Sequence, residues 1–330
     1  MADIHKYFLE FHDTIKLSNI EENKILQEKR DMLIGNLKEK LPDDVPSFSQ
    51  FNQGSYAMNT GVNPKDNDFD IDVGIVFECT RSKFTPVELK KKIRDALVYA
   101  NRQVQIRRSC VTVQYVKNGE NCYHVDLAVY VKREEDSLLD LAKGKEFSGE
   151  SEIYWELSDP KGLISRIQNG STYCSEAKHT AQMRRCIRYM KFWRDNKLPC
   201  GKPVSIALTC AAQQWFSPKE DRLGKDDDLD AMFNLASQIH TFVGLNGNIS
   251  LPVQPYANLL DKLTESQLND FLDRLEELKN ALGDARAEDD PVEACKKLMK
   301  QFGACFPVPE KSETAKTSVK AAVLPSGTSA

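Results

Sequence analysis

Two aspartates, one residue apart, lie in a segment that the sequence predicts to be a β-strand. Apolar residues alternate strictly along Phe69–Phe77, while Asp70 and Asp72 occupy the intervening positions. A period of two is typical of a strand with one apolar face, so both carboxylates project from the opposite face. Such a pair is more often a solvated strand face than a site. This strand is otherwise strongly apolar, however, and like charges near a sheet interior are costly unless a cation neutralises them.

A third aspartate and a glycine–serine turn accompany this pair. The β-forming runs 104–116 and 122–132 flank an Asn-Gly turn, which is a strong hairpin signal. Asp126 lies on the second arm of this predicted hairpin, on a strand whose other face is apolar. Gly54-Ser55 comes about fifteen residues before the aspartate pair. Gly-Ser followed at this spacing by two aspartates on an alternating strand is a moderately specific pattern, although Gly-Ser alone carries no signal.

Nucleotidyl transfer is the chemistry that needs these residue types in this order. Three carboxylates from adjacent strands can hold two Mg²⁺ ions, which require oxygen ligands and leave positions for water and phosphate. Such ions activate an attacking hydroxyl and stabilise the departing pyrophosphate. A Gly-Ser turn offers backbone N–H groups and a hydroxyl to phosphates. We therefore predict Asp70, Asp72 and Asp126 as catalytic and metal-binding residues, with Mg²⁺ as the cofactor and Mn²⁺ as an alternative ion.

The remaining elements divide the chain into two lobes and a tail. Helical spacing predicts one long helix or a broken pair over residues 4–40 and a capped helix over 85–101. The stretch from 135 to 158 is polar, and helices dominate beyond it. We predict them at 176–196, 203–216, 228–243, 265–282 and 291–302. The predicted domains are 1–158, 159–307 and a flexible tail over 308–330.

Composition limits the classes of protein to which the chain can belong. Its 330 residues carry 45 Lys+Arg against 49 Asp+Glu, which gives no general basic field for nucleic acid. No apolar run approaches the length of a membrane span, and the N-terminus is not typical of a signal peptide. The nine cysteines form no Cys-x-x-Cys pair and indicate reduced thiols. We expect a cytoplasmic monomer without a membrane partner or an obligatory nucleic-acid partner.

The motifs resemble those of a known family. Gln53-Gly54-Ser55-Tyr56, Asp70-Ile71-Asp72-Val73-Gly74 and His124-Val125-Asp126 are similar to the signature elements of the polymerase-β-like nucleotidyltransferases. Within that superfamily the chain most resembles the cGAS/DncV-like nucleotidyltransferases (CD-NTases), the bacterial cyclic-oligonucleotide synthases. The resemblance covers roughly residues 4 to 302. It implies an α+β fold, with a mixed-sheet nucleotidyltransferase lobe, a long N-terminal spine helix and a C-terminal helical lobe.

The resemblance also implies binding residues and a reaction. Gln53, Gly54 and Ser55 would bind nucleotide. Lys191, on a helix with a basic stripe that includes Arg184 and Arg188, would bind the donor triphosphate, as would Ser205 at the start of the next helix. The substrates would be nucleoside triphosphates, ATP together with GTP or another. The product would be a cyclic di- or trinucleotide second messenger in anti-phage signalling.

Several alternatives stay open from the sequence. A linear oligonucleotide synthase would carry the same triad, and a catalytically idle nucleotide- or RNA-binding scaffold is a further hypothesis. Asp68 creates a second Asp-x-Asp register in front of Asp70. Some members of the family are joined through their C-terminal carboxylate to other molecules by a ubiquitin-type conjugating enzyme. By resemblance, Ala330 is a hypothetical site of the same conjugation.

Overall fold

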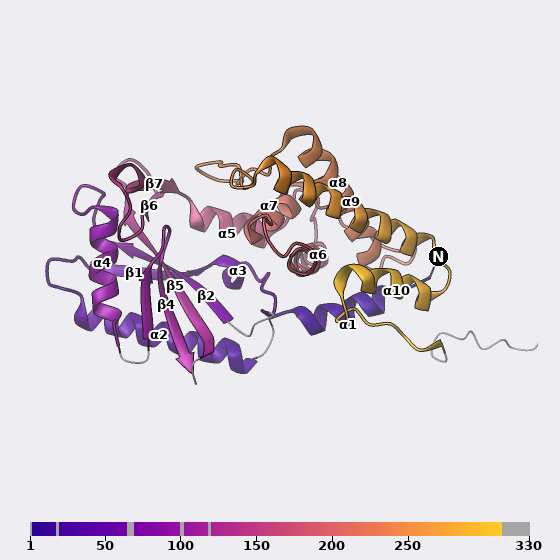
Figure 1. Ribbon diagram of the computed structural model, residues 1–330, viewed down its shortest axis with the longest axis horizontal. Coiled ribbons are helices and arrows are strands. Elements are labelled where there is room, and N and C mark those ends of the chain that lie inside the picture. The colour runs from indigo at the N-terminus through magenta and orange to yellow at the C-terminus, as the bar shows by residue number, and fades with distance from the viewer. Residues whose placement is uncertain (1, 18–19, 65–68, 100–101, 118–119, 312–330) are drawn as a thin grey trace, which may run out of the picture.

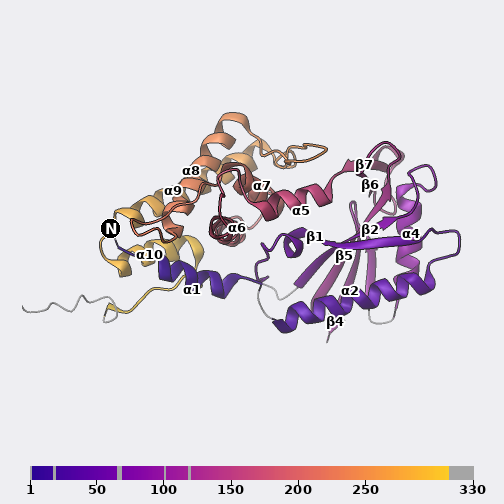
Figure 2. The same cartoon turned by 180° about the vertical axis from the view of Figure 1, so that it is seen from behind.

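The protein consists of a sheet lobe and a helical lobe, which lie side by side along its longest axis (Figure 1). The computed structural model describes residues 2–311, except for 18–19, 65–68, 100–101 and 118–119. The mixed sheet with flanking helices, followed by a helical lobe, confirms the predicted α+β class. Figure 2 shows from behind how α2 runs beneath the sheet and how α1 continues beneath the helical lobe.

The described residues form a seven-stranded mixed sheet. Its strands are β1 (Phe48–Gln53), β2 (Phe69–Phe77), β3 (Arg102–Ile106), β4 (Val111–Lys117), β5 (Glu120–Lys132), β6 (Leu139–Lys143) and β7 (Tyr154–Ser158). The order is β1-β2-β5-β4-β3, with β6 pairing with β5 and β7. Only the central pair β2–β5 is parallel among these strands. Parallel strands need a crossover, which here passes through α4 and β3–β4.

Helices cover the sheet and build the second lobe. Their bounds are α1 (His5–Ile15), α2 (Ile20–Lys40), α3 (Gly54–Ala57), α4 (Pro86–Leu97), α5 (Pro160–Asn169), α6 (Ala177–Lys197), α7 (Ser205–Trp215), α8 (Asp228–Asn246), α9 (Glu265–Ala287) and α10 (Pro291–Phe302), with a 3-10 turn at Glu150–Glu152. In the part of the chain that the structure describes, every helix is too short or too polar to cross a bilayer.

Two hydrophobic cores stabilise the lobes. One lies between the sheet and the pair α2 and α4, and contains Ile71, Val73 and Ile75 from β2. The predicted alternation is confirmed, because these residues are fully buried while Asp70 and Asp72 lie on the opposite face. The second core fills the helical lobe. The sheet therefore buries one face against helices and turns its acidic face toward the second lobe.

The N-terminal segment belongs to both lobes. The structure breaks it into α1 and α2, the second of the two predicted forms. Phe8 and Phe11 of α1 are fully buried in the core of the helical lobe, whereas Leu33 and Leu37 of α2 pack under the sheet. The two halves therefore bridge the lobes, although α1 falls within the range 1–158 that we assigned to the first domain.

The structure also shows elements that the sequence did not reveal. β6 and β7 lie in the stretch 135–158, whose charged residues obscure the strand signal. The run 104–116 is not one strand but two, β3 and β4. Asp68 and the Asn118-Gly119 turn lie outside the described residues, as does the tail from 312 to 330. Val308, at the start of the predicted tail, packs against the helical core.

A close approach between β1 and β2 explains Gly74. A Cβ atom built on Gly74 would lie 2.4 Å from the Phe51 ring, which is shorter than any real contact. Phe51 packs there beside Val76, Ala128 and Tyr130, in the small cluster on the acidic face of the sheet. A side chain at this position would therefore separate β1 from β2 or displace the ring.

We expect Gly74→Ala to lower the melting temperature, with a destabilisation of about 1–3 kcal/mol, because overpacking forces the ring or the strand to move. Gly35→Ala is the matched control. Nothing lies within 4 Å of a Cβ atom at Gly35 in helix α2, so this change should be neutral or stabilising by up to about 1 kcal/mol. Thermal unfolding measures both variants. Equal melting temperatures for Gly74→Ala and the wild type would contradict the packing argument.

Candidate active site

The register of the sheet places the predicted site residues in a row across adjacent strands. Gln53 on β1 is opposite Asp72 on β2, and Asp72 is opposite Asp126 on β5. Thr112 on β4 continues the row opposite Asp126. Asp70 lies two residues before Asp72 and is paired with His124. Because directly paired residues project from the same face, all three aspartates point toward the helical lobe.

The turn after β1 brings the backbone against Asp72. Gly54 has a φ of +64°, and a Cβ atom at this position would lie 1.7 Å from Asp72 Oδ2. Glycine is therefore required both by the left-handed backbone and by the space that the carboxylate occupies. Ser55 follows in the first turn of α3. The Gly-Ser element and the acidic strand thus touch each other.

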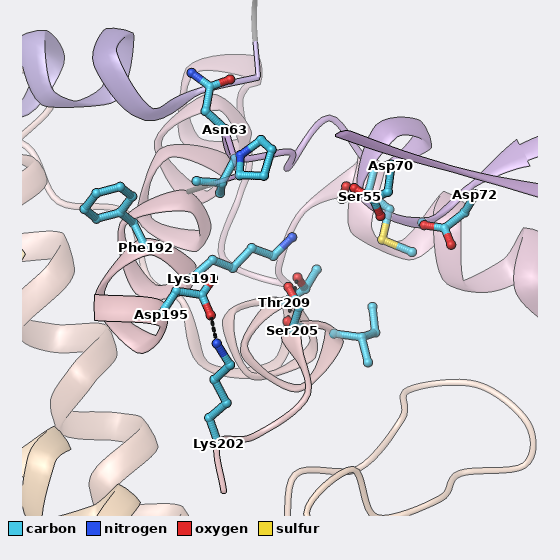
Figure 3. Close-up of a pocket in the computed structure, with 15 residues that line it drawn as sticks. Ser55, Asn63, Asp70, Asp72, Lys191, Phe192, Asp195, Lys202, Ser205 and Thr209 are labelled. Atoms are coloured by element: carbon cyan, nitrogen blue, oxygen red, sulfur yellow. Dashed lines mark hydrogen bonds and ion pairs between the residues drawn. The ribbon is translucent and has the colours of Figure 1, made fainter. Parts of the chain in front are cut away.

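A cavity of about 570 Å³ lies between the lobes. Six of the residues predicted from sequence line it: Gly54, Ser55, Asp70, Asp72, Lys191 and Ser205. Figure 3 shows the Lys191 side chain extending into this space toward the strand that carries Asp70 and Asp72. Asp126 and Gln53 are not among its lining residues, although both are beside Asp72 in the row. The cavity therefore has carboxylates on one wall and a lysine and a serine on the other.

Lys191 is a buried cation held by neutral groups. Its ammonium donates to the carbonyl oxygen of Thr60 at 3.0 Å and to the Thr60 hydroxyl at 3.1 Å. Burial, followed by the nearby Arg194 and Arg188 guanidinium groups, lowers the pKa of Lys191 to about 7. An anion entering the cavity would compensate this burial.

The rest of the basic stripe on α6 joins the lobes. Arg188 donates to the carbonyl oxygens of Asn59 at 2.5 Å and Gly61 at 3.1 Å, and Arg184 donates to the carbonyl of Gln168. Gln168 in turn donates to the Ala57 carbonyl at 2.8 Å. The residues of the predicted stripe therefore have different roles. Lys191 reaches the cavity, whereas Arg188 binds the loop that follows α3.

Burial and repulsion between carboxylates raise the pKa values of Asp70 and Asp72. Desolvation in the cleft, followed by repulsion from Asp70 and Asp126, raises the pKa of Asp72 to about 7. Desolvation also raises the pKa of Asp70, with a further contribution from Asp126 and an opposing one from His124. This electrostatic conflict is what a bound cation would relieve.

The three aspartates fit Mg²⁺ by the chemistry of their donors. Asp70, Asp72 and Asp126 supply only oxygen ligands from one sheet face, as a hard divalent cation requires. As the side chains stand, no three acidic, histidine or cysteine groups of the described residues converge on a single point. The fit therefore rests on the oxygen donors that β2 and β5 bring to one face of the sheet.

A second cavity of about 230 Å³ opens on the other side of Asp72. It shares Gly54, Met58, Asp72 and Ile206 with the first cavity and is lined mainly by apolar groups from α5 and from the loop after α8. Gln53 lines this second cavity, where its Oε1 accepts a hydrogen bond from the Tyr130 hydroxyl at 3.1 Å. This mainly apolar cavity therefore lies directly beside Asp72.

The structure also adds cavity residues that sequence reasoning missed. Phe192, Lys202 and Thr209 line the first cavity, and Lys202 Nζ is 2.5 Å from Asp195 Oδ1 (Figure 3). No side chain caps the first turn of α7, which begins at Ser205, so its N–H groups add a partial positive charge to this wall. Lys202 lies beyond the turn that follows α6. Because it is outside any periodic pattern, the sequence carried no signal that could have identified it as a cavity residue.

Two family models match the chain. The model described as "Cyclic GMP-AMP synthase DncV-like, nucleotidyltransferase domain" matches residues 48–130, which contain the acidic row. The model described as "Cyclic GMP-AMP synthase, C-terminal domain" matches residues 180–314, which include Lys191 and Ser205. Both walls of the first cavity therefore fall within matched regions.

Several solved structures share this fold at low sequence identity. The Bradyrhizobium diazoefficiens CD-NTase CdnG in complex with GTP is 16% identical, with a TM-score of 0.67 over 90% of this chain and 95% of that one. Vibrio cholerae DncV with a linear intermediate is 21% identical, with a TM-score of 0.61 over 94% and 88%. Escherichia coli DncV with 3'-deoxy GTP is 20% identical, with a TM-score of 0.59 over 84% and 76%. These likenesses establish the fold.

We expect Asp72→Asn to stabilise the metal-free protein at neutral and higher pH. The folded state raises the pKa of Asp72 from 3.8 to about 7, so ionisation between these values destabilises the fold as pH rises. In EDTA the variant should gain about 1–3 kcal/mol over the wild type at pH 8 and almost nothing near pH 4. Thermal unfolding across this range measures the difference. The exposed Asp273→Asn on α9 is the control, and an equal gain there would contradict the argument.

Proposed function

The chain belongs to the cGAS/DncV-like nucleotidyltransferases, and from this premise we propose that it joins nucleoside triphosphates into a cyclic di- or trinucleotide with release of pyrophosphate. The observation that carries the proposal is that Asp70 and Asp72 face Lys191 and Ser205 across one cavity, with Asp126 paired beside Asp72 on the next strand. Carboxylates for cations and a basic wall for phosphates are the two requirements of nucleotidyl transfer. The proposal extends to signalling in anti-phage defence.

The first cavity suits the donor triphosphate. Lys191 would exchange its contacts with Thr60 for phosphate oxygens, which favour its charged form. Ser205 and the uncapped first turn of α7 would donate to the same phosphates. Lys202 could leave Asp195 to contribute a second charge. These residues contribute position and charge compensation rather than covalent chemistry.

The second cavity suits the base of the acceptor nucleotide. Its apolar walls begin beside Asp72, so an acceptor held there would present its sugar hydroxyl to the acidic row. Asp126, between Asp72 and Thr112 in the row, would orient that hydroxyl and accept its proton as the oxygen attacks the donor α-phosphorus. Pyrophosphate would leave toward Lys191. A second turn of the same reaction on the linear intermediate would close the ring.

Asp70, Asp72 and Asp126 would hold two Mg²⁺ ions. When bound, the ions would supply charge for the attacking and leaving oxygens. The raised pKa of Asp72 supports this role, because the carboxylates carry an unfavourable charge density without a cation. The Gly54 backbone, against Asp72, would limit the directions that its carboxylate can take.

The product defines the function. We expect the purified protein, incubated with ATP, GTP, CTP, UTP and Mg²⁺, to release pyrophosphate and to form a product whose mass fits a cyclic dinucleotide or trinucleotide. Asp70→Asn and Asp126→Asn should each lower the rate by at least about a hundredfold, because each loses a cation ligand. Mass spectrometry with phosphatase treatment identifies the product. A linear product with a terminal triphosphate would replace the proposal with a linear synthase, and no turnover with Mg²⁺ or Mn²⁺ would overturn it.

Lys191→Met should weaken triphosphate binding about ten- to a hundredfold, since a charged hydrogen bond contributes about 1.5–3 kcal/mol. Isothermal titration calorimetry with a non-hydrolysable triphosphate measures the affinity. Lys178→Met is the matched control, because Lys178 lies on the same helix but pairs with Glu220 on the surface. Equal affinity in Lys191→Met and the wild type would show that the ammonium serves only to hold the Thr60 loop.

A further inference from the structure

Thr112 is the last residue in the row that runs across the sheet from Gln53 through Asp72 and Asp126, and its hydroxyl is buried. Its side chain is 2% exposed, and its Oγ1 donates to Asp126 Oδ1 at 2.5 Å. The two residues are directly paired between β4 and β5, so the contact follows from the strand register and not from a flexible loop. The proposed reaction does not use Thr112 as a ligand or as an acid or base. Its hydroxyl nevertheless donates a hydrogen bond to one of the three carboxylates.

This hydrogen bond would have two effects on Asp126. It occupies Oδ1, so that the second carboxylate oxygen is the one left for a cation or an acceptor hydroxyl. A short O–H···O⁻ bond also restricts rotation of the carboxylate, which repulsion from Asp72 would otherwise turn away. Asp72 lies directly opposite Asp126 on the other neighbouring strand. The carboxylate is therefore held on one side by a donor and repelled from the other by a like charge.

The backbone that carries Thr112 is itself anchored. Lys90 on α4 is fully buried, and its ammonium donates to the carbonyl oxygens of Arg107, Arg108 and Gly144 at 3.1, 2.8 and 3.1 Å. These bonds fix the turn that leads into β4. Cys110, at the end of that turn, has its Sγ 3.6 Å from Thr112 Oγ1. Thr112 therefore has little freedom to follow a rotating carboxylate.

We propose that Thr112 is a positioning residue, whose hydroxyl fixes the Asp126 carboxylate so that its second oxygen binds the divalent cation. This inference rests on the proposed function, because it assumes that the acidic row binds a cation. A residue with only a packing role would need the shape of the threonine side chain but not its hydroxyl. The hydroxyl and the shape can be separated by substitution.

The test compares Thr112→Val, which keeps the shape and removes the donor, with Thr112→Ser, which keeps the donor. Binding of Mn²⁺ to the full chain is measured by electron paramagnetic resonance, and pyrophosphate release is measured with nucleoside triphosphates. We expect Thr112→Val to weaken Mn²⁺ binding about tenfold, the usual effect of losing a group that orients a metal ligand. It should also lower kcat with little change in KM, while Thr112→Ser stays near the wild type.

Two controls separate positioning from damage to the fold. Thr180→Val removes a hydroxyl from a buried threonine on α6, in the other lobe, and should leave Mn²⁺ binding unchanged. Adding Thr112→Val to Asp126→Asn should weaken Mn²⁺ binding no further, because the carboxylate that it positions is already absent. Thermal unfolding of each variant confirms that the fold is intact.

The experiments give different outcomes for the positioning role of Thr112 and for the proposed function. Wild-type Mn²⁺ affinity in Thr112→Val, or equal weakening in Thr112→Val and Thr112→Ser, would overturn the positioning role. A wild-type protein that binds Mn²⁺ but forms no product would overturn the proposed function and leave the positioning role to be judged by binding alone. A wild-type protein that does not bind Mn²⁺ would overturn both.

Discussion

The in-register parallel pairing of β2 with β5 is the constraint on which the site depends. It sets Asp72 directly beside Asp126, and the antiparallel neighbours on either side complete the row with Gln53 and Thr112. A shift of β2 by one residue would turn both Asp70 and Asp72 into the apolar core and expose the apolar residues of the strand in their place. The buried face of β2, with Ile71, Val73 and Ile75 against α2 and α4, makes such a shift very costly. Hydrophobic burial on one face therefore holds repelling charges together on the other.

The consequence is a cleft that is electrostatically unsatisfied in the free protein. Asp72 has a raised pKa on one wall, and Lys191 has a lowered pKa on the opposite wall. The two shifts have a common origin, because both groups are removed from water before a ligand of opposite charge is present. Strain of this kind is typical of functional sites and is supported by stability elsewhere in the molecule. Here the two hydrophobic cores supply that stability.

Hydrogen bonds to backbone carbonyls connect the two walls of the cleft. Arg188 and Lys191 of α6 donate to the loop 59–61, which follows directly from the Gly54-Ser55 turn. Carbonyl oxygens satisfy the donors of a buried cation without neutralising its charge. The loop therefore ties the lobes together through contacts that leave the charge of Lys191 unneutralised. Helix α1, packed in the helical core, gives a second connection between the lobes.

The direction in which a side chain points within a strand or a helix depends on the local sequence, and the sequence by itself determined it. Alternation along 69–77 predicted the acidic face of β2. Helical spacing predicted α6 to α10 of the second lobe, four of them to within three residues of their ends, but it did not predict α5. The motifs identified the three aspartates and, by resemblance, Lys191 and Ser205. The charged segment 135–158 concealed β6 and β7, because their burial comes from neighbours rather than from their own pattern.

Only the tertiary structure decided which strands are neighbours, that Thr112 completes the row, that Lys202 reaches the cavity and that Arg188 binds a loop. Each of these depends on contacts between segments far apart in the chain, and the packing of the whole fold determines those contacts.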